Sequence, residues 1–385
     1  MKSNIFNHTA NSAGKIAGQS LQNCFTPYGI VAGLHHFTDL WARDSFFAAF
    51  GANVIGHPSA TENTIKTFLS FQSPAGLIPY RIQRSPTSIS KYFGRPRYFN
   101  KPRPNFRSRQ SGGLVLDGGL MLIIAFAEYI KIYNNMKFLN KHYPSLKKCL
   151  NWYIGKYKNG LLAEWFMSDW QDSVLKVGKT LYSNILYWKA LSDFSRLSVL
   201  NNKSDLQFFS DLALQIKAKI MTAFWNGQFL ADWIDYKRHH IFNTLGNLLA
   251  VWWGLTDSSQ SQSIINYARK YCLHGFTLEE NYPRYPFWRI PFWNYLYGIG
   301  DYHNRGCLWL QPGLLYALSL NKLGQHREAR NMLLKISKII LKNNGVYEVY
   351  EKNGSPVRRW LYRSEYPFAW SAGLYLYALS FLGRS

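Results

Sequence analysis

Apolar residues recur along this chain with helical spacing, and they do so in two distinct ways. Between residues 120 and 130 the apolar positions are three and four residues apart, but nearly every position in 120–127 is apolar. This pattern is typical of a helix that is buried on all sides. Over 325–342, by contrast, the apolar residues form one stripe and charged residues cover the rest. That pattern indicates an outer helix with one face in solvent.

The two kinds of helix alternate along the sequence. Pairs of an inner-type and an outer-type helix are predicted at 44–56 with 59–72, 117–135 with 141–156, 180–199 with 203–224, 241–254 with 258–271 and 304–323 with 325–342. A short helix near 11–23 and a last apolar helix at 366–382 bring the number to about twelve. We therefore predict an all-α fold, an (α/α)6 toroid of two concentric rings, as a single domain over residues 1–385. An open helical solenoid is the alternative, but no residue-level repeat of fixed period is present.

Composition adds two signals to this pattern. A hydrophobic content of 47% is ample for a core and excludes a disordered chain. The aromatic content of 17%, with 14 Trp and 26 Tyr, suggests stacking surfaces, for which the flat apolar faces of sugars are frequent partners. The formal net charge of +24 raises the separate hypothesis of a nucleic-acid or anionic-surface partner.

The four cysteines lie far apart, and the sequence has no CxxC pair and no histidine at zinc-ligand spacing. This argues against a zinc ribbon or a disulfide scaffold, and we predict no metal and no cofactor. No window has the roughly eighteen uninterrupted apolar residues of a membrane span, and the N-terminus has no signal-peptide pattern. We expect a monomer that makes no membrane contact and is either cytoplasmic or exported by a signal-peptide-independent route.

Two long interruptions separate the helical segments. Residues 81–110 carry nine Lys or Arg, no acids and several prolines, and residues 276–302 are rich in aromatic residues and proline. Loops of this length in a compact domain are typically functional or disordered. Tyr98, Phe99 and Phe106 interleave with arginines, as in proteins that bind single-stranded nucleic acid. We favour instead a solvated insertion near the mouth of the toroid.

The most concentrated polar motif is HFTDLWARDS at 36–45, directly before an apolar helix. Charged residues next to a buried helix are costly unless they are paired or face a polar ligand. Arg43 offers a fork of donors beside the acceptor Asp44, which is how proteins hold sugar hydroxyls. A helix start with a local ion pair is an equally good interpretation of these residues alone.

The sequence has no metal cluster, no glycine-rich phosphate loop and no nucleophile elbow, which leaves a pair of carboxylates as the common catalytic device. Glu164, Asp169 and Asp172 interleave with tryptophans in a polar break before a helix, a setting that favours a raised carboxyl pKa. Helix capping by an aspartate is the alternative. Glu348, between apolar neighbours, is a candidate half-buried base or an ordinary loop acid.

A further polar segment, GDYHNRGCLWLQP at 300–312, is predicted to open another inner helix. His303 alone is more typical of a satisfied polar residue than of a catalyst. Clustered with Asn304 and Trp309, it fits a contact to sugar hydroxyls.

Taken together, these segments resemble a known group. FTDLWARDS at 37–45 resembles the tryptophan and Arg-Asp signature of glucoamylases and of the amylo-α-1,6-glucosidase part of glycogen-debranching enzymes. GLIPY, LDGGL, WQD and YHN through Trp309 follow in the order expected for the debranching group, at 76–80, 116–120, 170–172 and 302–309. EVYEKNG at 348–354, with AWS downstream, is more similar to the base-carrying segment of glucoamylases. The resemblance spans about residues 30–380.

The resemblance implies an (α/α)6 barrel and an inverting exo-acting glycoside hydrolase. Asp172 would be the general acid and Glu348 the general base, with the two carboxyls about 6.5–9.5 Å apart to admit the water. The terminal sugar would be bound by Trp41, Arg43, Asp44, Trp170, His303, Asn304 and Trp309.

One departure concerns the acid. Glucoamylases carry a glutamate directly after the tryptophan, where this chain has Gln171, and only the debranching-type spacing makes Asp172 the acid. The expected substrate is an α-glucan such as glycogen, starch or maltodextrin, from whose non-reducing ends glucose is released. Amylo-α-1,6-glucosidase activity, hydrolysis of sucrose or another small saccharide, and a carbohydrate-binding pseudoenzyme are the alternatives.

Overall fold

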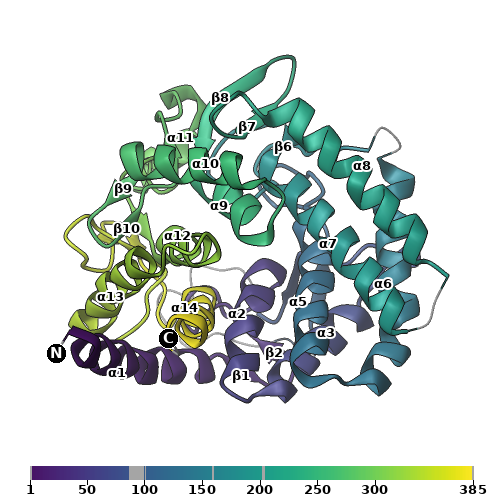
Figure 1. Cartoon of the computed structure of the whole chain (residues 1–385), viewed down its shortest axis with the longest axis horizontal. Coiled ribbons are helices and arrows are strands. Elements are labelled where there is room, and N and C mark those ends of the chain that lie inside the picture. The colour runs from purple at the N-terminus through teal and green to yellow at the C-terminus, as the bar shows by residue number, and fades with distance from the viewer. Residues whose placement is uncertain (1, 86–98, 100, 158–159, 202–203, 384–385) are drawn as a thin grey trace.

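The computed structural model of this protein describes residues 2–85, 99, 101–157, 160–201 and 204–383, with side chains from residue 6 onward. The described part of the chain contains thirteen α-helices and a set of short strands (Figure 1). Six helices form an inner ring: α2 (Ala42–Val54), α5 (Asp117–Tyr133), α7 (Leu181–Leu200), α9 (Thr244–Trp253), α12 (Leu310–Lys322) and α14 (Ala369–Leu382).

The inner ring is closed. Each inner helix packs against the next one in chain order, and α14 returns to pack against α2. An outer helix follows or precedes each inner one: α1 (Lys2–Gln22), α3 (Pro58–Ser70), α6 (Met136–Lys156), α8 (Leu206–Phe224), α10 (Ser258–Tyr271) and α13 (His326–Asn343). Figure 1 shows this outer layer around the inner helices. The predicted (α/α)6 toroid is confirmed, and the open solenoid is excluded by the contact of α14 with α2.

The inner helices are buried on nearly every side, which explains their weak amphipathic pattern. In α14 almost every residue from Ala369 to Ala378 is buried, whereas α13 buries only one stripe. The backbones of α2 and α14 approach closely, and a Cβ built on Gly373 would lie 2.5 Å from the Cα of Ala48. A residue without a side chain is needed at this contact, because a Cβ contact below 3.0 Å forces the backbones apart.

The predicted boundaries differ from the structure mainly at two helices. The first helix is much longer than the expected 11–23, and it packs on α13 and α14, so that it is the outer partner of the last inner helix. The helix expected at 304–323 begins only at Leu310. The segment before it is held out of the helix because strand β12 (Leu308–Trp309) pairs with β13 (Val349–Tyr350).

All strands are short and antiparallel, and several of them lead directly into inner helices. The three-stranded sheet joins β3 (Leu40–Trp41), β4 (Arg81–Gln83) and β5 (Arg103–Asn105). The four-stranded sheet has the order β11 (Asn281–Tyr282), β8 (Arg238–Asn243), β7 (Ala231–Ile234) and β6 (Lys179–Thr180). Two-stranded ribbons pair β1 (Phe25–Thr26) with β2 (Gly29–Ile30), β9 (Leu273–His274) with β10 (Thr277–Leu278) and β14 (Arg358–Arg359) with β15 (Tyr362–Arg363).

Because β3, β6, β8 and β12 each precede an inner helix, the sheets fix the N-terminal ends of these helices. A short helix, α11 (Phe292–Leu296), lies in the aromatic loop. The four cysteines are buried and form no disulfide. Among the helices that the structure describes, none combines the length and the apolar character needed to cross a bilayer.

Candidate functional site

A cavity of about 1010 Å³ opens at the N-terminal ends of the inner helices. Its wall includes residues that directly precede or begin those helices: Trp41 and Arg43 at α2, Trp309 at α12 and Trp370 at α14. A second cavity of about 520 Å³ adjoins it, and the two share Arg43, Asp172 and several other lining residues. The convergence of helix starts from distant parts of the chain therefore creates one polar and aromatic site.

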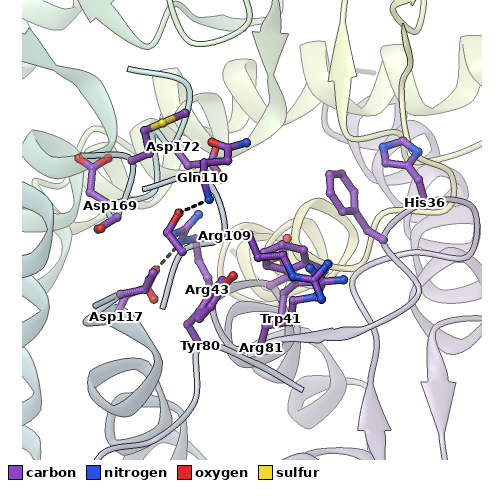
Figure 2. A pocket seen from close by; sticks show the side chains of 16 residues that line it. His36, Trp41, Arg43, Tyr80, Arg81, Arg109, Gln110, Asp117, Asp169 and Asp172 are labelled. Atoms are coloured by element: carbon purple, nitrogen blue, oxygen red, sulfur yellow. Dashed lines mark hydrogen bonds and ion pairs between the residues drawn. The ribbon is translucent and has the colours of Figure 1, made fainter. Parts of the chain in front are cut away.

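Arg43 is anchored by an aspartate that begins the next inner helix. Its Nε donates to Asp117 Oδ2 at 2.6 Å, and its Nη1 donates to the backbone carbonyl of Trp170 at 3.3 Å. Figure 2 shows this ion pair, with Asp169 and Asp172 on one side of the pocket and His36 on the other. Asp117 is almost fully buried, so the pair fixes the guanidinium against the cavity wall. This ion pair spans 74 positions, so it is not the local pair that the motif suggested, and Arg43 also lines both cavities.

Asp44 lines both cavities beside Arg43. Burial raises the pKa of its carboxyl to about 7, although the adjacent Arg43 guanidinium acts to lower it, and the negative charge of Glu348 adds to the increase. The pKa of Asp44 is therefore coupled electrostatically to the general-base candidate Glu348, which lies more than 300 residues away in the sequence.

Asp172 also lines both cavities, and half of its side chain is exposed there. The surrounding protein displaces bulk water and so raises the pKa of this carboxyl, while the nearby positive groups of His303 and Arg43 oppose the rise. Oδ1 of Asp172 lies 3.8 Å from Nε2 of His303. A cavity-facing carboxyl with a raised pKa has the properties of a general acid.

The neighbours of Asp172 have a different environment. Gln171 is fully buried, and its side-chain oxygen accepts hydrogen bonds from Asn243 Nδ2 at 2.8 Å and from the Tyr285 hydroxyl at 2.7 Å. Asp169 forms a 2.5 Å ion pair with the buried Lys176. These contacts give both residues a supporting role in the wall.

Glu164 is also buried, where it accepts hydrogen bonds from the hydroxyls of Thr180 at 2.7 Å and Ser183 at 2.6 Å. It lines neither cavity. Of the three acids predicted in this segment, Asp172 alone lines the larger cavity, and Asp169 reaches only the smaller one.

Glu348 directly precedes β13 and lines the larger cavity together with Asp172. Its carboxylate accepts hydrogen bonds from the hydroxyls of Tyr302 and Tyr362, and from the backbone N–H of Glu365 at 3.2 Å. Burial raises the pKa of Glu348, and the positive field of His36 and the two hydroxyl donors oppose this rise. The side chain is buried rather than half-buried, and it is oriented by three donors.

His303 and the tryptophans form the aromatic part of the site. The His303 ring stacks on Trp309, with 5.1 Å between centroids, and meets the Trp170 ring edge to face at 5.1 Å. Nδ1 of His303 lies 2.6 Å from Oε2 of the buried Glu280. Trp41, Trp170, His303 and Trp309 all line the larger cavity.

Asn304 is the one predicted site residue that lines neither cavity. Its amide accepts from the backbone N–H of Tyr285 at 2.8 Å and donates to the Tyr285 carbonyl at 3.1 Å. The turn before β12 directs this side chain into the wall. Asn304 is therefore not placed to contact a sugar in the cavity directly.

Several lining residues were not singled out from the sequence. Asp117, Tyr302 and Trp370 lie in the LDGGL, YHN and AWS motifs, so the sequence motifs could have identified them. His36 opens the motif at 36–45, whereas Tyr362 has no such signal, because only the folded chain brings it to Glu348. Trp293 and Trp360 are both exposed. Trp293 lies in α11 within the aromatic segment 276–302, whereas Trp360 lies in a loop without a motif.

The basic segment contributes to the same site. Arg81 and Gln83 lie in β4, and Arg109 and Gln110 line the smaller cavity. Tyr98, which the nucleic-acid hypothesis uses, lies outside the described residues, as do the rest of 86–98 and residue 100. Of the described residues of this segment, Arg81, Ser108, Arg109 and Gln110 line the smaller cavity.

Comparisons with known proteins agree with this architecture. Residues 103–277 match the family described as the bacterial alpha-L-rhamnosidase six-hairpin glycosidase domain. No curated protein matches the chain by sequence.

Solved structures share the fold over almost their whole length. The GH63 mannosylglycerate hydrolase from Thermus thermophilus, in complex with Tris and D-glycerate, has a TM-score of 0.72 and 14% identity, over 95% of this chain and 99% of that chain. A wild-type glycosidase has a TM-score of 0.69 and 13% identity, over 99% and 98%. An uncharacterized conserved protein from Thermus thermophilus has a TM-score of 0.70 and 13% identity, over 95% and 99%. The solved structures show that the chain has the six-hairpin glycosidase fold, and residues 103–277 are similar to the six-hairpin domain of the matched family.

Proposed function

We propose that this protein is an inverting, exo-acting α-glucosidase that releases glucose from the non-reducing ends of α-glucans such as maltodextrin, starch or glycogen. The observation that carries the proposal is the presence of Asp172 and Glu348 in the wall of one cavity, in contrasting surroundings. Asp172 is half exposed and has a raised pKa, whereas Glu348 is held by three hydrogen-bond donors. Burial raises the pKa of both carboxyls, so the roles are assigned from their contacts: Asp172 is open to the cavity, and Glu348 is oriented by its three donors.

In the proposed reaction, protonated Asp172 donates its proton to the glycosidic oxygen as the bond from that oxygen to the anomeric carbon breaks. Glu348 removes a proton from a water molecule, whose oxygen forms the new bond to the anomeric carbon from the opposite face. The configuration at that carbon is inverted, as expected when a water fits between two carboxyl groups. Tyr302 and Tyr362 orient Glu348 toward this water through their hydrogen bonds.

Binding of the terminal sugar is assigned to Arg43 and Asp44, a donor and an acceptor side by side on the cavity wall. Asp117 holds the guanidinium in place. The rings of Trp41 and Trp309 offer apolar faces for stacking on the sugar.

A second candidate function is hydrolysis of a small glycoside with an anionic aglycone. Arg363 is exposed and lines the cavity. Among the described residues it has no ion-pair partner. One structure with this fold is a mannosylglycerate hydrolase with D-glycerate bound. Amylo-α-1,6-glucosidase and sucrose-hydrolysing activities remain as further alternatives.

One experiment tests these candidates together. The protein is incubated with maltotriose, isomaltose, glycogen, sucrose and glycerate glycosides, and the products are followed by proton NMR from the first minutes. We expect β-glucose to accumulate first from an α-linked glucan. Early α-glucose would contradict inversion, and cleavage of the glycerate glycosides alone would favour the second candidate. The absence of hydrolysis of all substrates would overturn the proposal.

A further inference from the structure

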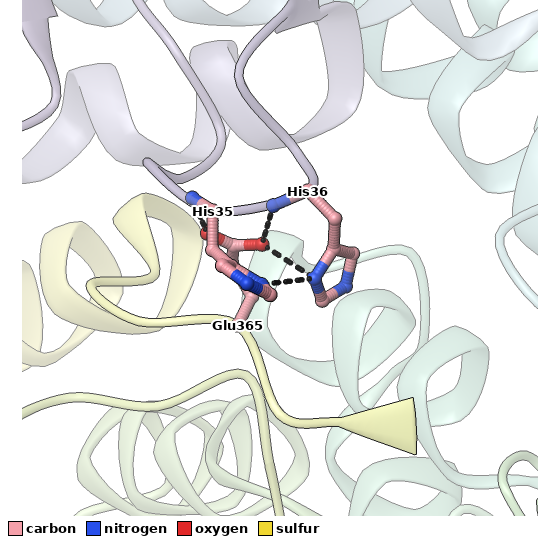
Figure 3. Close-up of side chains that lie close together, drawn as sticks. All are labelled: His35, His36 and Glu365. Carbon is pink, nitrogen blue, oxygen red and sulfur yellow. Dashed lines mark hydrogen bonds and ion pairs between the residues drawn. The ribbon is translucent and has the colours of Figure 1, made fainter. Parts of the chain in front are cut away.

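Two adjacent histidines and a distant glutamate converge at the rim of the cavity. Nδ1 of His35 lies 3.1 Å from Nδ1 of His36, and the latter lies 3.0 Å from Oε2 of Glu365. One possible ligand atom from each of the three residues lies within 4.8 Å of the others. Figure 3 shows the His36 ring linked both to the His35 ring and to the carboxylate, which comes from the segment before α14.

The carboxylate at the centre of this cluster is rigidly held. It accepts hydrogen bonds from the backbone N–H groups of three consecutive residues, at 2.5 Å from His35, 2.7 Å from His36 and 3.1 Å from Phe37. The Glu365 side chain is fully buried, and burial acts to raise its pKa, but the His36 side chain and the backbone N–H groups of His35 and His36 outweigh this effect and lower it. A Cβ on Gly33 would lie 2.3 Å from Glu365 Cγ, so glycine is required there for the carboxylate to fit.

The three facing atoms are a carboxylate oxygen and two imidazole nitrogens, each of which carries either a proton or a lone pair according to its tautomer. Such atoms at about 3 Å require an electropositive species between them, which is either a proton or a metal ion. Around a tetrahedral Zn²⁺ with ligands at about 2.0–2.2 Å, neighbouring ligand atoms are about 3.3 Å apart. The two short separations of 3.0 and 3.1 Å are close to this value.

We propose that His35, His36 and Glu365 bind a transition-metal dication of the Zn²⁺ class at the rim of the cavity. Two imidazoles and one carboxylate are a ligand set that suits such ions and not Mg²⁺ or Ca²⁺, which prefer oxygen ligands alone. Both histidines are partly exposed and line the cavity, so an ion has a path from solvent. A tetrahedral ion of this class has a fourth coordination position, which water or a ligand would fill.

The bound ion connects two segments that are far apart in the sequence. Residues 35–37 lead into β3, while Glu365 is paired through its backbone with Glu348, whose N–H donates to the Glu365 carbonyl at 3.1 Å. The ion therefore holds the segment that precedes α2 against the segment that carries Glu348. We expect metal binding to stabilise the closure of the helical ring between α2 and α14.

The test measures binding of the metal alone, without any substrate, so its result is independent of the proposed glycosidase activity. Chelator-treated protein is titrated with ZnCl₂ by calorimetry and with CoCl₂ by visible absorption. We expect one Zn²⁺ per chain, a Co²⁺ spectrum typical of nitrogen and oxygen ligands, a Tm that rises with Zn²⁺ and no response to MgCl₂.

Single variants identify the ligands. His35→Ala and His36→Ala should each lose the stoichiometric binding, and Glu365→Gln should weaken it at least tenfold. His326→Ala is the matched control, since His326 is an exposed histidine on α13 whose only described side-chain partner is Asn321. Circular dichroism verifies that each variant is folded. Wild-type protein that binds no Zn²⁺, which would leave a shared proton as the species between the rings, overturns the proposal. Binding that survives both histidine substitutions also overturns it.

Discussion

Gln171 and Asp172 are adjacent in the sequence but have opposite exposures: Gln171 is fully buried, whereas half of the Asp172 side chain is exposed in the cavity. Gln171 accepts hydrogen bonds from Asn243, Tyr285 and Lys176 inside the wall. The glutamine that stands where glucoamylases carry a glutamate thus has a structural role here. The acid is assigned to the next residue, which the cavity exposes.

Asp172→Asn should nearly abolish the hydrolysis of maltose and glycogen, with a loss of roughly 10²–10⁴-fold. The proton of a general acid matters most when the leaving group is poor. Activity on α-glucosyl fluoride, whose leaving group needs little protonation, should therefore be largely retained. Initial rates on both substrates measure the difference.

Asp169→Asn is the matched control for this variant, because Asp169 forms an ion pair with Lys176 and does not line the larger cavity. It should lose less activity, and by the same factor on both substrates. Glu348→Gln should be inactive on both, since water must be activated whatever group leaves. If Asp169→Asn retained activity on the fluoride alone, the acid would be Asp169.

Arg43→Lys should lower kcat/KM by about tenfold or more, which corresponds to about 1.4 kcal/mol of transition-state stabilisation. Lysine keeps the charge beside Asp117 but lacks the planar fork that binds two hydroxyls at once. Steady-state kinetics and the Tm are measured together. The Tm should be nearly unchanged, and a variant that mainly unfolds would show that Arg43 is structural.

The pH dependence of kcat/KM should reflect the raised pKa of Asp172. The acid works only when protonated, so activity is lost as the pH rises through this pKa, and a raised pKa extends the active range upward. The charge of His303 lowers the pKa of Asp172, so His303→Gln should shift the alkaline limb to higher pH. An alkaline limb that stays in place would contradict the coupling of the two residues.

Glu164→Gln should make stability less dependent on pH. Burial raises the pKa of Glu164 from 4.5 to about 7, so the folded state holds a proton that the unfolded state loses. This proton contributes about 3 kcal/mol to the free energy of unfolding. The contribution is complete below pH 4.5 and is lost as the pH rises to about 7. The decrease in unfolding free energy between about pH 5 and about pH 8, measured with urea, should be smaller in the variant. An equal decrease in both proteins would contradict the assigned pKa.

Gly373→Ala should destabilise the protein by about 1–3 kcal/mol, because the new methyl group enters the contact of α14 with the backbone of α2. Gly155→Ala in α6 is the matched control. A Cβ there meets no atom within 4 Å, and alanine is the better helix former. Thermal unfolding should therefore show a lower Tm for Gly373→Ala and an unchanged or higher Tm for Gly155→Ala.

The sequence by itself determined the helices and their alternation, because helical periodicity and all-round burial are local properties that a short window records. It also pointed to many of the residues that line the cavity, because residues such as Trp41, Arg43 and Trp309 lie in compact motifs at the starts of inner helices. The single domain, the monomeric state and the cytoplasmic or signal-independent destination stay predictions.

Only the tertiary structure decided which neighbouring residue faces the cavity and which distant residues meet. Asp172 and Gln171 differ by one position, so their exposures follow from the path of an irregular loop that no periodicity describes. Asn304 is directed into the wall because β12 pairs with β13, an interaction between residues about forty positions apart. Glu365 meets His35 and His36 across some 330 residues because α14 closes the ring against α2. Ring closure is a property of the whole chain, and no local pattern encodes the contacts that it creates.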